Sequence, residues 1–157
     1  MIVFLTMFQF LVLSQGKIHA RILKSSIVNF APVKLHHVVI VTTPSSGLYA
    51  VDFSHEENSM KTKLLLLLGK SVPGEVRVRK LCTPVDIDID QALLLEWINM
   101  TTAETSSREV TNKTMDGIRE DELRKYIVRL MEWNDRTMNL YRSNCQHFSR
   151  MALSKPF

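Results

Sequence analysis

Residues 33–41 (VKLHHVVIV) constrain the fold of this chain more than any other segment. The run ends in four consecutive β-branched residues, from Val38 to Val41, which is typical of a strand that is buried on both faces. A turn containing Pro and Gly follows at 42–47, and a second apolar run occupies 48–53. The pattern predicts a β-hairpin that belongs to a larger sheet.

The rest of the chain mixes strand and helix signals. Alternation of apolar and charged side chains at 75–81 predicts a half-exposed strand, while the five leucines within 63–68 fit either a strand or a buried helical turn. Residues 91–100 are expected to form a short helix, and the Thr-, Ser- and Glu-rich stretch 101–113 a loop. Apolar side chains at three- and four-residue spacing predict a long amphipathic helix over 121–138, capped by its first residue.

Composition narrows the class of protein. The 157 residues are 45% hydrophobic and 23% charged, which fits one globular domain. The net charge of +4 comes without a Lys/Arg cluster, which argues against nucleic acid as a partner. Two cysteines are too few for a disulfide framework or a tetrahedral cysteine zinc site. The acidic run 86–90 lacks the Gly and Glu of a calcium loop, so no metal site is expected.

The amino-terminal segment resembles a signal peptide. Residues 1–13 are apolar and uncharged, too few to span a bilayer but long enough for a signal-peptide core, and small residues follow up to Gly16. On this interpretation the segment 1–16 is removed and 17–157 forms a single secreted or lumenal domain. The alternative is a buried amino-terminal strand or helix of a cytoplasmic protein.

The sharpest chemical signal is the segment 141–149 (YRSNCQHFS). Ser143 or Asn144 is a suitable N-cap, which places Cys145 in the first turn of a last helix. The unpaired N–H groups and the positive dipole end of a helix favour a thiolate there. Cys145 could then attack a carbonyl if an imidazole accepts its proton.

The box Asn144-Cys-Gln-His-Phe148 resembles the Asn-Cys-Glu/Asn-His-Phe box of circularly permuted papain-like thiol enzymes. This group includes lecithin:retinol acyltransferase-like acyltransferases, PPPDE isopeptidases and bacterial permuted amidases. Its base histidine comes first, on a strand that His37-Val-Val-Ile-Val41 resembles, and its nucleophilic cysteine comes late, at the start of a helix. The resemblance implies a permuted papain-like α+β fold in which the cysteine helix packs on an antiparallel sheet.

The resemblance also implies roles for individual residues. Cys145 would attack an amide or ester of a peptide or lipid, forming a thioester, His37 would carry the proton, and Asp52 would orient His37. Water as acceptor gives a hydrolase, and an amine or lipid acceptor gives an acyltransferase. No cofactor is expected.

Several alternatives stay open at this point. His36 is the alternative base, because adjacent residues on a strand point to opposite faces and only one can meet Cys145. His147 lies about 200° around the helix from Cys145, so we expect it, like Asn144, to support the box. Cys145 could also be a buried thiol, or form a disulfide with Cys82, in a non-catalytic binding or structural domain on the same fold.

Overall fold

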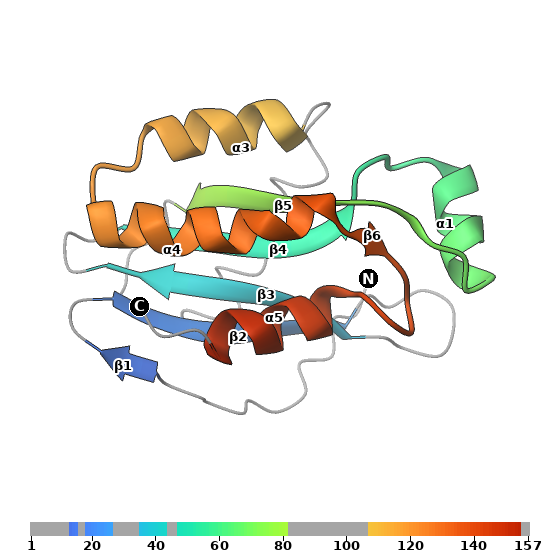
Figure 1. Cartoon of the computed structure of the whole chain (residues 1–157), viewed down its shortest axis with the longest axis horizontal. Helices are drawn as coiled ribbons and strands as arrows, with labels where there is room; N and C mark the ends of the chain where they lie inside the picture. The colour runs from blue at the N-terminus through green and yellow to red at the C-terminus, as the bar shows by residue number, and fades with distance from the viewer. Residues whose placement is uncertain (1–12, 16–17, 27–34, 44–46, 82–106, 155–157) are drawn as a thin grey trace.

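The computed structural model describes residues 13–15, 18–26, 35–43, 47–81 and 107–154. Six strands form one antiparallel sheet in which spatial order follows chain order (Figure 1). The strands are β1 (Leu13–Gln15), β2 (Ile18–Ser26), β3 (Leu35–Thr42), β4 (Leu48–His55), β5 (Val72–Leu81) and β6 (Thr137–Met138).

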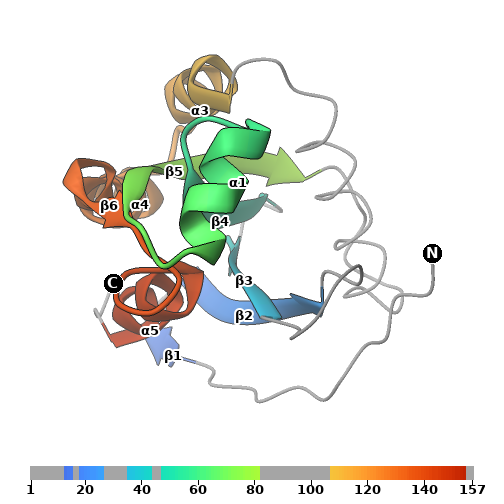
Figure 2. The same ribbon diagram turned by 90° about the vertical axis from the view of Figure 1, so that its right-hand side faces the viewer.

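The described helices lie on one face of this curled sheet and at its margins (Figure 2). They are α1 (Met60–Leu67), α3 (Ser107–Asp116), α4 (Asp121–Met131), the 3₁₀ helix η1 (Glu132–Asp135) and α5 (Cys145–Ser154). Helices α4 and α5 cover one face, α3 lies along β5, and α1 stands at one end. The α+β class is therefore confirmed. In these parts of the chain no helix is long and apolar enough to cross a membrane.

The predicted hairpin is present as β3 and β4, which pair with Val39 opposite Val51. The strand expected at 75–81 is the second part of β5, and the leucine run is helical, in α1. The segment 91–100 and the acidic run 86–90 lie outside the described residues.

Three expectations were wrong. The stretch 101–113 was expected to be a loop, yet α3 begins at Ser107 and packs on β5. The long helix ends at Met131, because the chain turns through η1 into β6 to extend the sheet. Its N-cap is Glu120, without a side-chain hydrogen bond, and Asp121 is already helical.

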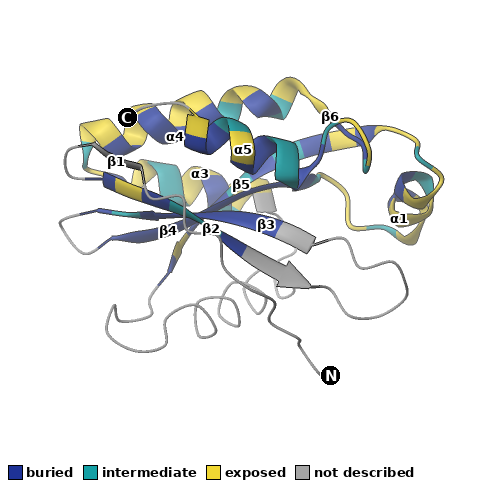
Figure 3. Ribbon diagram, turned by 90° about the horizontal axis from the view of Figure 1, so that it is seen from below, coloured by how far each residue is buried: buried dark blue, intermediate teal, exposed yellow. Residues whose placement is uncertain are grey.

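Burial separates the core face of each helix from its outer face (Figure 3). The inward side chains of β2 to β5 meet the buried faces of α4 and α5 in one hydrophobic cluster. Tyr126 of α4 donates its hydroxyl to the carbonyl of Ala152 in α5 at 2.9 Å. Burial raises the pKa of Tyr126, so this hydroxyl keeps its proton and its hydrogen bond joins the two helices.

Side chains satisfy the edge of β5 where β6 does not reach. The main-chain N–H of Val76 donates to Asn134 Oδ1 at 2.6 Å, and that of Val78 donates to Thr111 Oγ1 at 3.2 Å. Because an open strand edge is a template for aggregation, these two contacts close part of the edge within the chain.

Gly74 of β5 tests this packing. A Cβ added there would overlap Phe53 Cζ and would lie 3.0 Å from the carbonyl oxygen of Arg136. Gly74→Ala should therefore lower the free energy of unfolding by about 1–3 kcal/mol, the usual range for overpacking. At Gly117 an added Cβ would find its nearest neighbour at 3.4 Å, so Gly117→Ala should be tolerated. Urea unfolding of both variants measures the difference, and equal stability would contradict the packing described.

Candidate active site

Helix α5 begins at the cysteine, and Asn144 caps it. Asn144 Oδ1 accepts hydrogen bonds from the main-chain N–H groups of Gln146 at 2.9 Å and His147 at 3.2 Å. The Asn144 side-chain amide donates to the carbonyl of Leu140 at 2.7 Å, which ties the cap to the preceding turn. Cys145 is consequently the first helical residue, at the positive end of the helix dipole.

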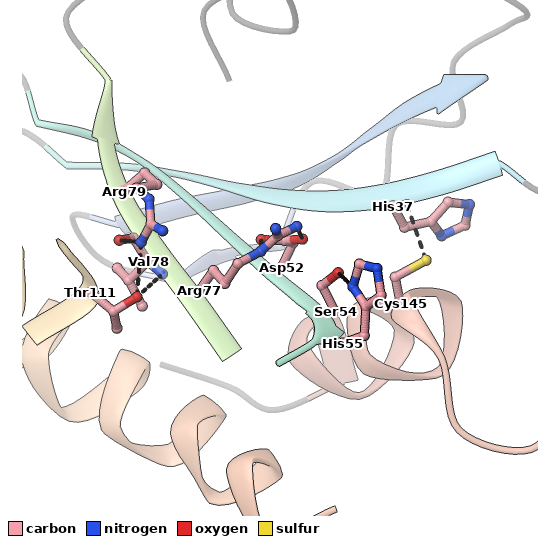
Figure 4. Close-up of polar contacts among 9 residues, drawn as sticks. All are labelled: His37, Asp52, Ser54, His55, Arg77, Val78, Arg79, Thr111 and Cys145. Carbon is pink, nitrogen blue, oxygen red and sulfur yellow. Dashed lines mark hydrogen bonds and ion pairs between the residues drawn. The ribbon is translucent and has the colours of Figure 1, made fainter. Parts of the chain in front are cut away.

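Cys145 lies against β3, where it meets His37 (Figure 4). The main-chain N–H of His37 donates to Cys145 Sγ across 3.5 Å. Both residues are buried, and Cys145 is a free thiol. Because a donor aimed at sulfur stabilises the anion more than the neutral thiol, this contact and the helix terminus both favour the thiolate.

The imidazole of His37 contacts the next turn of the same helix. Its Nδ1 lies 3.0 Å from Ser149 Oγ, and Ser149 Oγ donates to the carbonyl of Gln146 at 3.1 Å. A hydroxyl has one proton, so when both contacts are made Nδ1 carries the ring proton and donates. The neutral imidazole then has its lone pair on Nε2.

An aromatic cluster holds α5 in this place. The ring of Phe148 stacks on Phe53 of β4 with centroids 6.1 Å apart, and both rings contact Trp133 edge-on, at 5.5 and 5.3 Å. Phe53 and Phe148 are fully buried. Since Phe148 follows Cys145 by three residues, the cluster fixes the start of α5 against the sheet.

The β3–β4 register places Asp52 and His37 on opposite faces of the sheet. Val39 lies opposite Val51, and residues alternate between faces along each strand. His37 therefore shares a face with Phe53, while Asp52 points to the other face. There Asp52 is 1% exposed and pairs with Arg77 of β5, through Nε at 3.1 Å and a terminal nitrogen at 2.5 Å. Ser149, four residues after Cys145 on one helix face, contacts the ring instead.

The other expected residues are placed as follows. His36 also lies in β3, but its side chain is outside the described part. His147 Nδ1 is 2.9 Å from Asn144 Oδ1, so His147 braces the cap. His55, at the end of β4, shares its strand face with Phe53, and its Nδ1 lies 3.0 Å from Ser54 Oγ. In Figure 4 it lies at the same end of the sheet as Cys145.

Two further expectations concern residues 82–106, which are not described. Cys82 lies there, yet the free thiol of Cys145 leaves no disulfide between the two cysteines in this structure. In the described ranges no group of three or more His, Cys, Asp or Glu residues could hold a metal ion.

Comparison with protein-family models gives no match, and comparisons with curated proteins and with solved structures give none either.

The Asp52–Arg77 pair yields a prediction that separates stability from chemistry. Asp52→Asn leaves the Arg77 charge, only 13% exposed, without its carboxylate, which should cost about 3 kcal/mol of unfolding free energy. Cys145 reactivity towards a small alkylating reagent should stay unchanged, since Asp52 lies on the other face. Asp116→Asn, at an exposed position in α3, is the matched control and should change stability by less than about 0.5 kcal/mol. Slower alkylation of Cys145 in Asp52→Asn, with unchanged stability, would show that Asp52 acts on the site.

Proposed function

We propose that the chain is a cysteine-dependent hydrolase or acyltransferase with a permuted papain-like fold. The observation that carries the proposal is the contact between the main-chain N–H of His37 and Cys145 Sγ, which brings together two residues 108 positions apart in sequence. A free cysteine at a helix N-terminus, beside a histidine on a strand, is the arrangement that activates a thiol for attack on a carbonyl. The order of histidine strand before cysteine helix also agrees with the permuted group.

In the proposed mechanism Cys145 gives its proton to the imidazole of His37, and the sulfur forms a bond to the carbonyl carbon of an amide or ester. The negative charge on the carbonyl oxygen is stabilised by the main-chain N–H of Cys145. The C–N or C–O bond then breaks, and the imidazolium returns the proton to the leaving group. Water, an amine or a lipid hydroxyl next attacks the thioester, giving up its proton to His37, and releases Cys145.

Ser149 is the positioning residue of this proposal. Its hydroxyl accepts from Nδ1–H and thereby fixes the tautomer and the orientation of the His37 ring. Ser149 also shares the rigid turn that holds Cys145, so histidine and sulfur are fixed by the same helix.

A non-catalytic binding or structural domain is the competing proposal. The burial of Cys145 favours it, because structural cysteines are commonly buried and inert. Under either proposal, secretion depends on removal of the segment 1–16, of which residues 13–15 form β1 and the others lie outside the described residues.

Trapping of the acyl-enzyme distinguishes the two proposals. Incubation with an activated ester, such as a p-nitrophenyl acylate, should add one acyl group to Cys145, detected by mass spectrometry and removed by neutral hydroxylamine. His37→Ala should slow this acylation by about a hundred-fold or more, the usual contribution of a positioned base. Ser149→Ala should slow it less, and His36→Ala should leave it unchanged.

The matched control is Cys145→Ser, which keeps the shape of the site and removes the thiol. Absence of a Cys145 adduct in the wild type, or equal labelling of Cys82 and Cys145, would favour the binding domain. An effect of His36→Ala that exceeds that of His37→Ala would transfer the base to His36.

A further inference from the structure

Helix α1 presents a row of large apolar side chains to solvent. Met60, Leu64, Leu67 and the C-cap residue Leu68 are 71%, 54%, 67% and 74% exposed. At about 100° per residue these four positions fall within an arc of about 100° on the helix. Thr62 and Leu66 are buried on the opposite side. Single exposed apolar side chains are ordinary, whereas four on one helix face indicate a binding surface.

Caps at both ends hold this helix rigid. Ser59 Oγ accepts from the main-chain N–H of Thr62 at 3.1 Å. At the other end Gly69 has φ 72°, and the N–H groups of Gly69 and Lys70 donate to the carbonyls of Leu66 at 3.0 Å and Leu65 at 2.9 Å. This is the Schellman arrangement, which satisfies the last carbonyls of a helix. The exposed leucines therefore belong to a defined surface.

An exposed aromatic residue extends the row. Tyr141, in the turn before α5, is 65% exposed. Its ring would lie 3.3 Å from a Cβ added at Gly69, so it packs beside the end of α1. Asn139 donates to the carbonyl of Gly69 at 2.8 Å and so links the two segments. The apolar surface thus runs from Met60 through Leu68 to the turn that leads into Cys145.

Positive charge flanks this surface on both sides. Seen around the helix, the apolar arc lies between Lys63 on one side and Lys61 on the other, and both lysines are exposed. Helix α1 contains no acidic residue. The nearest acids in sequence, Glu56 and Glu57, line a groove with Lys61 and Leu65 beside β5. These carboxylates therefore lie near Lys61, and Lys63 flanks the arc on the other side. Lysine stems can lie along apolar surface beside leucines while their charged heads stay in water, as they do at membrane interfaces.

We propose that α1 and Tyr141 dock on the surface of a bilayer containing anionic lipids, with the leucines among the acyl chains and the lysines at the headgroups. Charge complementarity favours an anionic lipid surface over a second copy, because two copies meeting through α1 would oppose their lysines. This docking does not depend on the catalytic role of Cys145.

Sedimentation with vesicles tests the proposal on the full chain. Wild-type protein should partition onto phosphatidylcholine vesicles containing phosphatidylserine and much less onto phosphatidylcholine alone, and added salt should weaken binding. Leu64→Gln with Leu67→Gln should weaken binding by about ten-fold or more. Lys61→Gln with Lys63→Gln should weaken it by about five-fold for each lysine.

The matched controls are on α4. Val128 is 51% exposed and Lys125 is exposed, so Val128→Gln and Lys125→Gln remove similar groups elsewhere and should leave binding intact. The apolar residues 1–13 are common to all variants and cannot produce a difference between them. Equal binding to both vesicle types, or unchanged binding of the leucine variant, would overturn the proposal. Loss of a dimer in the leucine variant with unchanged vesicle binding would assign the surface to a second copy.

Discussion

The site depends on the packing of the start of α5 against β3 and β4. Phe148 stacks on Phe53, and this contact presses the first turn of the helix onto the sheet. At that point the main-chain N–H of His37 reaches the sulfur of Cys145, and the His37 ring reaches Ser149. A strand from the first third of the chain and a helix from its end thereby form one site. The cap by Asn144 sets where the helix begins, and so where the sulfur lies.

Much of the fold could be predicted from local patterns. The β-branched run of β3 and the alternation in β5 identify strands because their period matches the pleat. Helix α3 and strand β2 were missed for a different reason. The polar residues of α3 show no strong apolar face, and the helix is stabilised by contacts with β5 such as that between Thr111 and Val78. Tertiary contacts of this kind leave little trace in a single sequence.

The candidate site, like the fold, could be predicted from the sequence only in part. The position of Cys145 at a helix start followed from the capping residue before it, and the support from His147 followed from its place on the helix. The partner of His37 could not be predicted, because the β3–β4 register decides which face Asp52 occupies, and a shift of one residue reverses it. Ser149 did carry a signal, its spacing of four from Cys145, but serine at that spacing is too common to be specific.

The most direct test of the His37–Cys145 pair is the pH dependence of Cys145 alkylation by iodoacetamide, in protein with Cys82→Ser. An ordinary thiol has a pKa of about 8.5, and its alkylation slows about ten-fold for each pH unit below that value. With the helix terminus and the His37 contacts favouring the thiolate, alkylation should stay fast as the pH falls through 7, and His37→Ala should slow it there while His36→Ala does not. A rate that follows an ordinary thiol from pH 5 to 9, unchanged in both histidine variants, would contradict the pairing.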